Sequence, residues 1–442
     1  MSGTGTVSAV PPGTGKRRLW RRYGASAAFL APALVLLGVW VVYPAVYTFI
    51  RSFFDRAGDE FVLFDNYQTL FTSDLLLTAI RNNAIWVAVV PMLVTVLGLL
   101  FAVLTERVGW AVAFKTAVFM PMAISAFAAG VIWRVTLEED PDRGVVNAGI
   151  AVVKDAVDPP GALPRAQPST EDLRGTPDRG FVLQRPVSPG DVAPLGLTAI
   201  PTRNVPEGSQ AAASPQPLSG GISGVVWRDF KPGGGQEGVV EPGESGLPGV
   251  TVELRGPDGT VVEDTQTADD GTFAFEDVEG GPFRAAISAR TFADPFTGVS
   301  WLGPALVVPS LLMAYVWIWA GFAMVVIGAG LAALPRDVLE AARTDGATEW
   351  QVFRRVTAPL LAPVLTVVFI TMVINVLKVF DIVLALAPGS VQDDATVIAV
   401  SMWRTAFGGV NDFGLGSAIA VFLFLLVIPV ILLNIRRFKR EQ

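Results

Sequence analysis

Long stretches without a charged residue limit the folding of this chain more than any other feature. Arg22 and Arg51 are separated by 28 uncharged residues, and the stretch from Pro295 to Pro335 is uncharged for 41 residues. A helix crosses the hydrocarbon core of a bilayer with about 20 predominantly apolar residues. Only 17% of the chain is charged, whereas soluble domains average about 25%. The sequence therefore predicts a membrane protein.

Six apolar stretches have about the length of a membrane span. Three fall within 23–137 and three within 296–442. Helices satisfy their own backbone groups in lipid, so we predict an all-α polytopic membrane protein. The expected spans are 23–50, 82–105, 116–133, 307–331, 356–377 and 413–435.

Positive charges lie mainly on one side of these spans. With the N-terminus inside, the cytoplasmic segments carry 15 Lys and Arg residues, and the short outer loops carry four. Loops rich in Lys and Arg stay in the cytoplasm. We therefore expect a cytoplasmic tail over 1–22, a cytoplasmic C-terminus, and residues 138–300 outside the cell membrane.

The residue types that are missing exclude several kinds of chemistry. The chain contains no His and no Cys, which excludes disulfides, thiol nucleophiles, Cys/His zinc sites and a His general base. It also lacks the Gly-x-x-x-x-Gly-Lys-Ser/Thr motif that holds nucleotide phosphates. The basic residues lie beside apolar spans and not in a soluble patch, so nucleic acid is not an expected partner. We expect no catalytic residue and no cofactor in this chain.

An acidic segment interrupts the apolar frame. Residues 138–300 hold 25 acidic and 12 basic residues. Twelve of the 32 prolines of the chain lie within 155–220, and such a composition buries too little apolar surface to offset the entropy cost of ordering. We predict a disordered tether over 138–221.

Residues 222–290 have a different pattern. Short β-branched runs alternate with Gly- and Asp-rich turns, which is typical of a small antiparallel β-sandwich. The run from Ile222 to Asp229, the segment 246–254 and the segment 270–275 resemble the B-type repeats of bacterial surface adhesins.

That resemblance implies a calcium loop, for which Asp229, Glu241 and Glu244 are weak candidates. Lys231 stands where the family usually has an oxygen ligand. We therefore favour a solvated acidic surface and expect no metal.

The loop between the fourth and fifth spans, residues 334–363, has a helix–glycine–helix pattern. Alanines and a leucine favour a first helix, and Gly346 permits a left-handed bend. We predict a helix over 337–343 capped by Asp337, a bend at Gly346, and a second helix over 348–356 that ends at Pro359.

The spacing of Glu340, Gly346 and Pro359 resembles the cytoplasmic coupling motif of ABC importer permeases. Further segments resemble permeases of the carbohydrate-importing branch, and those of α-glucoside systems most. These segments of the chain are 64–67, 81–83, 119–122, 132–134 and 319–322. Ala358 departs from the usual Leu of the motif. The resemblance implies an ABC permease fold in which residues 334–363, here called the coupling loop, contact a separate ATPase. The implied contact residues are Glu340, Ala341, Ala342, Asp345, Gly346 and Pro359.

Polar residues recur in the fifth span. Asn375, Lys378 and Asp381 are spaced three apart, so one continuous helix would place them on one face. Ionisable residues inside a membrane usually face a cavity or the bundle interior. This face either lines the substrate path or holds an internal Lys378–Asp381 ion pair, and both interpretations stay open.

The resemblance predicts the permease subunit of an ATP-driven importer for a carbohydrate. The implied partners are an ABC ATPase dimer that uses ATP, a second permease subunit, an extracytoplasmic sugar-binding protein and membrane lipid. The alternatives are an ABC permease for a non-sugar solute such as glycerol phosphate, and a membrane-anchored display protein. A display protein needs one anchor helix, whereas six spans and a coupling loop are predicted here.

Overall fold

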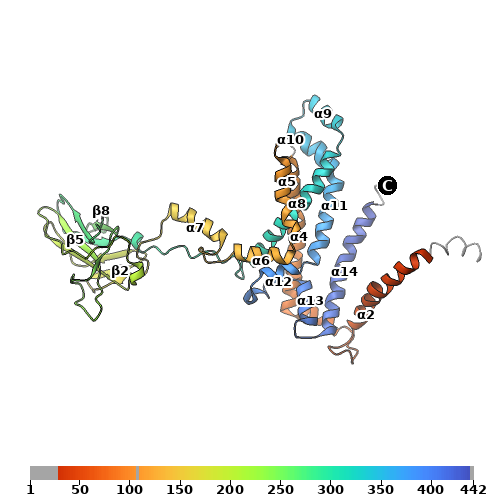
Figure 1. The fold of residues 1–442 in the computed structure, drawn as a ribbon, viewed down its shortest axis with the longest axis horizontal. Helices are drawn as coiled ribbons and strands as arrows, with labels where there is room; N and C mark the ends of the chain where they lie inside the picture. The colour runs from red at the N-terminus through yellow and green to blue at the C-terminus, as the bar shows by residue number, and fades with distance from the viewer. Residues whose placement is uncertain (1–27, 106–108, 439–442) are drawn as a thin grey trace, which may run out of the picture. The chain divides into compact units, whose positions relative to one another are not determined.

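The computed structural model describes residues 28–105 and 109–438, with side chains up to residue 432. The expected tail over 1–22 lies outside the described residues. The chain divides into two compact units. The helical unit comprises residues up to Leu137 together with those from Ser300 onward, and the insertion unit comprises Glu138–Val299 (Figure 1).

The helical unit contains long apolar helices joined by short ones. The first helix, Ala28–Arg51, includes a π-helical turn at Gly38–Val42. The remaining helices are α2 (Tyr43–Arg51, the end of that first helix), α3 (Asp65–Thr72), α4 (Asp74–Thr105), α5 (Ala111–Phe119), α6 (Ala126–Thr136), α8 (Val307–Ala332), α9 (Arg336–Thr344), α10 (Glu349–Val352), α11 (Ala358–Leu377), α12 (Asp381–Leu386), α13 (Ile398–Phe407) and α14 (Phe413–Phe438).

Five helices of the described residues are long and apolar enough to cross a membrane, and a sixth span results if α5 and α6 count as one. The expected straight span over 116–133 is wrong, because α5 and α6 meet at an angle of 104°. A 3₁₀ turn at Met120–Ala123 contains Pro121, and the Ser125 hydroxyl caps α6 by accepting from Ala128 N at 3.2 Å. Proline lacks the N–H that would continue the helix, so the chain turns there.

Helix α4 packs along α8 in the centre of the unit. Trp86 and Leu311 are fully buried in this core. A Cβ atom at Gly98 would lie 2.4 Å from the Cβ of Ala323. No larger residue fits at Gly98 without moving one of the two helices, which explains how two long helices approach so closely.

The insertion unit contains two five-stranded sheets. One follows the order β1–β4–β5–β6 with β9 also paired to β5, and the other follows β2–β3–β10–β7–β8. The elements are α7 (Val145–Val157), β1 (Gln167–Pro168), β2 (Leu173–Thr176), β3 (Gly180–Leu183), β4 (Val192–Thr198), β5 (Ile222–Arg228), β6 (Ser245–Gly246), β7 (Thr251–Arg255), β8 (Val261–Gln266), β9 (Thr272–Phe275) and β10 (Arg284–Ile287).

The predicted disordered tether over 138–221 is wrong. Strand β4 pairs with β5, and β3 pairs with β10. Leu195 and Leu197 of this segment are fully buried in the core of the sheets. The proline-rich composition hid these strands because their partners lie far along the chain.

The predicted strands within 222–290 are present, but one pairing differs from expectation. Strand β5 runs parallel to β4, with Val192 opposite Ser223 and Leu197 opposite Arg228. The other strand pairs are antiparallel. A β-sheet insertion is therefore present, and it begins before residue 222.

Candidate functional site

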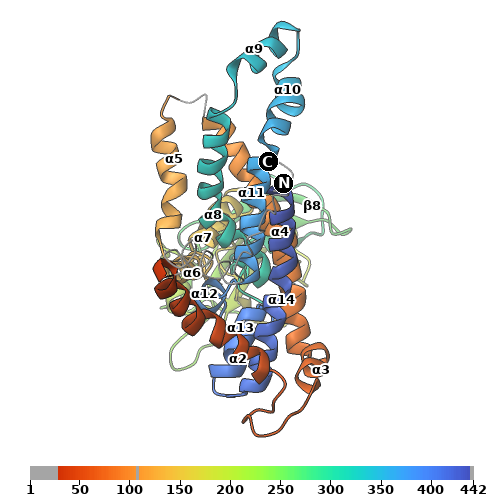
Figure 2. The ribbon, with the colours of Figure 1, turned by 90° about the vertical axis from the view of Figure 1, so that its right-hand side faces the viewer.

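The coupling loop forms two helices that project from one end of the helical unit (Figure 2). Helix α10 starts with a capping box, in which Thr348 N donates to Gln351 Oε1 at 2.8 Å and Gln351 N donates to Thr348 Oγ1 at 3.4 Å. The expected cap by Asp337 is wrong. Pro335 occupies the cap position without a side-chain bond, and Asp337 lies in the first turn of α9.

The predicted left-handed bend at Gly346 is confirmed, with φ of +83°. Gly346 N donates to Arg343 O at 3.0 Å, and Ala347 N donates to Ala342 O at 3.1 Å. These two bonds form the Schellman arrangement that satisfies the last carbonyls of a helix. The bend therefore ends α9 and sets the direction of α10.

Pro359 does not end the second helix, contrary to prediction. Residues Glu349–Leu377 form one helix of 29 residues, with a π-helical turn at Phe353–Thr357 just before the proline. Ala358 N donates to Phe353 O, five residues back. The wider π turn relieves the clash between a proline ring and the carbonyl four residues earlier. The coupling loop is thus continuous with α11.

An ion pair joins the two helices of the loop. Arg343 Nε lies 2.8 Å from Glu349 Oε1, and Nη2 lies 3.4 Å from Oε2. The carboxylate of Glu349 raises the pKa of the Arg343 guanidinium. Glu340 and Asp345 are exposed beside this pair, so the loop presents carboxylates on a fixed frame.

The other expected contact residues lie on the same two helices. Ala341 and Pro359 are exposed, and Ala342 is half-buried. Glu340 and Ala341 therefore lie on the exposed last turns of α9 and Asp345 at the bend, while Pro359 lies about three turns beyond the start of the second helix.

Under the loop lies an apolar groove of about 590 Å³. Leu99 and Val103 of α4, Leu339 of α9 and Trp350 of α10 line it. The Trp350 ring stacks on Phe353 with centroids 5.6 Å apart, and Trp350 is 67% exposed. The loop helices thus rest partly on apolar side chains.

The predicted face of the fifth span does not form. Helix α11 ends at Leu377, Lys378 and Phe380 have non-helical backbone, and α12 begins at Asp381. Lys378 and Asp381 are exposed, Asn375 is half-buried, and no ion pair joins Lys378 to Asp381 in the described chain. Asn375 therefore lies in α11, Lys378 in the break and Asp381 at the start of α12, so the three do not share one helical face.

Two neighbouring asparagines of α4 bind backbone at the end of α11 and before α13. Asn83 Nδ2 donates to the terminal carbonyl of α11, Leu377 O, at 3.4 Å, and Asn83 Oδ1 accepts from Ile398 N at 2.7 Å. Asn82 Nδ2 donates to Asp394 O and Thr396 O at 2.7 and 2.8 Å. Both side chains are buried. The sequence shows two adjacent amides in an apolar stretch but not the distant backbone that they bind.

The calcium candidates of the insertion bind protein groups. Asp229 Oδ2 accepts from Gly238 N at 2.6 Å, and Glu241 accepts from Gln236 N at 2.9 Å and from Lys231 Nζ at 3.2 Å. Burial and the neighbouring carboxylates raise the pKa of Glu244. Across the described residues, no group of three acidic side chains is placed to hold a metal ion.

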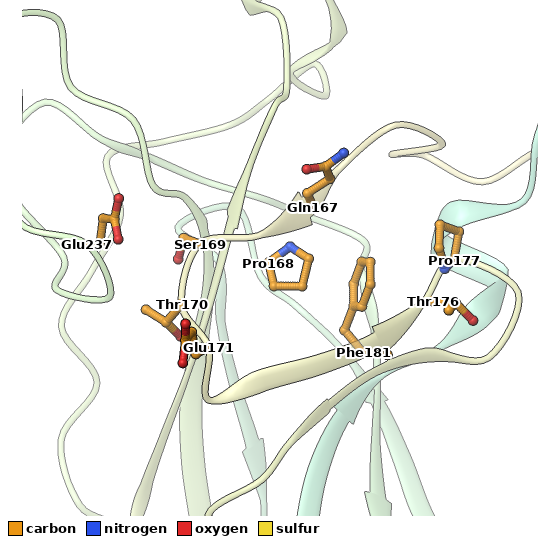
Figure 3. Close-up of a pocket in the computed structure, with 10 residues that line it drawn as sticks. Gln167, Pro168, Ser169, Thr170, Glu171, Thr176, Pro177, Phe181 and Glu237 are labelled. Atoms are coloured by element: carbon orange, nitrogen blue, oxygen red, sulfur yellow. The ribbon is translucent and has the colours of Figure 1, made fainter.

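A second hollow, of about 520 Å³, lies in the insertion between β1, β2 and the loop carrying Glu237 (Figure 3). Its polar edge includes Gln167, Thr170 and Glu171. Phe181, the aromatic residue of its lining, is only 2% exposed. This hollow therefore offers polar groups without an open ring face.

Two family models match the chain. The binding-protein-dependent transport system inner membrane component matches residues 273–438, and the SdrD B-like domain matches residues 220–295. The second match covers most of the strands of the insertion.

Two curated proteins are similar over nearly the whole chain, and a third over a shorter part. The osmoprotective compounds uptake permease protein of Synechocystis sp. is 29% identical over 414 residues, 94% of this chain and 99% of that protein. The α-glucoside transport system permease protein of Rhizobium meliloti is 28% identical over 418 residues, 94% and 82% of the two chains. A putative ABC transporter permease protein of Caldicellulosiruptor sp. is 33% identical over 118 residues, 27% of this chain and 84% of that protein.

A solved structure has the same fold. The bacterial ABC transporter involved in the import of the acidic polysaccharide alginate has a chain that matches with a TM-score of 0.57 and 16% identity, covering 96% of this chain and 99% of that chain. The two long alignments with curated proteins leave fewer residues unmatched than the insertion contains, so both run through it.

Proposed function

Because the chain belongs to the binding-protein-dependent permeases of ABC transporters, we propose that it carries a carbohydrate, specifically an α-linked glucoside, across the cell membrane. The observation that carries this proposal is the near full-length similarity to an α-glucoside permease. A trehalose/maltose permease protein of Thermococcus litoralis is also 37% identical over 146 residues.

Energy for transport comes, in this proposal, from ATP that a separate ATPase dimer hydrolyses. The exposed Glu340 and Asp345 at the Gly346 bend suit a cleft lined by basic residues. The Arg343–Glu349 pair joins the two helices of the loop across the bend. Movement of the ATPase would therefore pass into α11, because α10 and α11 form one continuous helix over Glu349–Leu377.

The proposed complex contains a second permease subunit and an extracytoplasmic sugar-binding protein. If α5 and α6 together form the third span, the chain has six spans, and an even number would put both termini on one side of the membrane and residues 138–300 on the other. The excess of Lys and Arg in the inner segments supports an orientation with both termini in the cytoplasm. Asn375, Lys378 and Asp381 remain candidates for the substrate path, now as residues in and around the break between α11 and α12.

The test is uptake by the complex purified from native membranes through a tag on the full chain. The ATPase, second permease and binding protein that co-purify are identified and reconstituted in vesicles with internal ATP. We expect uptake of radiolabelled maltose or trehalose, and none with a non-hydrolysable ATP analogue. Uptake of glycerol phosphate without uptake of either sugar contradicts the carbohydrate assignment.

The same preparation tests whether transport needs the insertion. The insertion core and the cores of the helical unit share no residue. Replacing residues 163–290 with a short Gly/Ser linker should therefore preserve assembly and at least part of the transport. An intact complex that lacks all transport, or loss of assembly with the helices still inserted, would make the insertion an integral part of the transporter.

A further inference from the structure

Helix α7 has an unusual distribution of side chains. Val145, Val152, Val153 and Val157 are 66–82% exposed, and Gly149 and Ala156 between them are also exposed. These six residues recur at helical spacing, so they form one uncharged face, here called the apolar stripe. A surface helix normally buries its apolar face, whereas α7 exposes it.

The polar face of α7 is the side that packs on the protein. Asn147 Nδ2 donates to Glu138 O, Glu139 O and Val299 O at 2.9, 3.0 and 3.0 Å, and Val299 N donates to Asn147 Oδ1 at 2.9 Å. Two helical turns after Asn147, Lys154 Nζ lies 5.4 Å from the centroid of the Phe296 ring. The apolar stripe is on the opposite side of the helix. The bonds of Asn147 therefore hold α7 with its apolar stripe facing outward.

These bonds also attach the start of α7 to the two ends of the insertion. Glu138 follows the last residue of the helical unit, and Val299 precedes its first returning residue. Two residues of chain between Thr136 at the end of α6 and Glu138 span at most about 7 Å. The first turn of α7 is therefore tied to both points at which the insertion leaves and rejoins the membrane-spanning part.

We infer that α7 is an interfacial helix whose apolar stripe lies in the surface of the bilayer. A partner covering the stripe must be apolar. The residues that hold the first turn of α7 adjoin the membrane-spanning part in the chain, and a lipid surface is an apolar partner that fits this connection. Amphipathic helices of this kind insert about 5–10 Å into the boundary between headgroups and acyl chains. The only charges on α7, Lys154 and Asp155, cancel and lie off the stripe, so headgroup charge is not the attraction. The inference is independent of the transported solute.

The chain offers a direct test because it contains no Cys. Val153→Cys places a single thiol on the stripe, and Asp155→Cys places one on the same helix roughly 160° away. Each full-chain variant is labelled with an environment-sensitive fluorophore and reconstituted in phosphatidylethanolamine vesicles with a minor share of phosphatidylglycerol. Glu263→Cys on the exposed strand β8 serves as a control remote in sequence.

Lipid carrying a nitroxide near the headgroup should quench the Val153 label at least about twofold more than the Asp155 label, with a blue-shifted emission. Iodide in the aqueous phase should show the reverse order. A Val153 label protected from both quenchers means that protein covers the stripe, and one quenched by iodide alone means that the stripe is free in water. Either result overturns the inference. The quenching measurement does not depend on sugar uptake, so it tests the position of α7 separately from the proposed function.

Discussion

Arg343 and Glu349 form the ion pair that connects the two helices of the coupling loop across Gly346, with Nε and Oε1 2.8 Å apart. The side chains are 48% and 55% exposed, and exposed pairs contribute only about 0–1 kcal/mol to stability. The pair therefore matters for the angle between α9 and α10 more than for the stability of the fold.

Reversal of one charge tests this role. Arg343→Glu places two carboxylates at the bend, so we expect reduced ATP-driven uptake with a change in unfolding free energy below about 1 kcal/mol. Uptake should return largely in the double variant Arg343→Glu with Glu349→Arg. Uptake at the wild-type level in the single variant shows that the pair is dispensable.

Gly346 is required for its backbone conformation and not for space. Nothing lies within 4 Å of a Cβ atom built at this residue, and its φ is +83°. Proline is held near −65° and cannot adopt this angle, whereas Asn visits the left-handed region. We expect Gly346→Pro to insert but lose transport and Gly346→Asn to keep most of it. Equal uptake by the two variants contradicts the need for the bend.

Glu340 should act in energy coupling and not in folding. Its side chain is exposed on α9, so Glu340→Lys should leave membrane insertion and thermal stability unchanged. We expect it to abolish uptake and to uncouple ATP hydrolysis from substrate. Asp337→Lys, one turn earlier on the same exposed helix, is the matched control and should transport. A transporting Glu340→Lys variant removes Glu340 from the coupling surface.

Asn82 and Asn83 should differ in their tolerance of a carboxylate. Asn83→Asp keeps the acceptor for Ile398 N, whereas Asn82→Asp loses two donors and faces the carbonyls of Asp394 and Thr396. Each buried polar group left without a partner costs about 1–3 kcal/mol. Thermal unfolding in detergent should therefore show a larger fall for Asn82→Asp. The opposite order would mean that the amide bonds described for Asn82 do not stabilise the fold.

Lys378 and Asp381 should not behave as a structural pair. They lie on either side of a helix break and are both exposed. We expect the double variant Lys378→Asp with Asp381→Lys to show the summed defects of the single variants, measured as the KM of sugar uptake. Recovery of wild-type kinetics by the charge swap would indicate a pair and remove both residues from the substrate path.

Local sequence patterns were sufficient to predict two kinds of element. These are helices that face lipid, and bends whose hydrogen-bond partners lie a few residues away in the chain. Uncharged length predicted the long helices of the membrane part, because a bilayer demands apolar residues along a whole helix. Likewise, the Gly346 bend followed from one glycine between two helix-forming runs, since a left-handed residue at a helix end is a local requirement.

Tertiary structure decided the features that depend on distant partners. The helix break after Leu377 is stabilised by Asn83 from another helix, and an apolar sequence that runs past the break gives no local sign of it. The strands before residue 222 pair with β5 and β10, so a proline-rich segment gains a core only when those strands are present. The sequence by itself determined the membrane class and the bend at Gly346, because composition controls the first and short-range geometry the second. Only the fold decided which polar side chains are buried and that the two ends of the insertion meet at Asn147. Hydrogen bonds between residues over a hundred positions apart leave no periodic signal in the sequence.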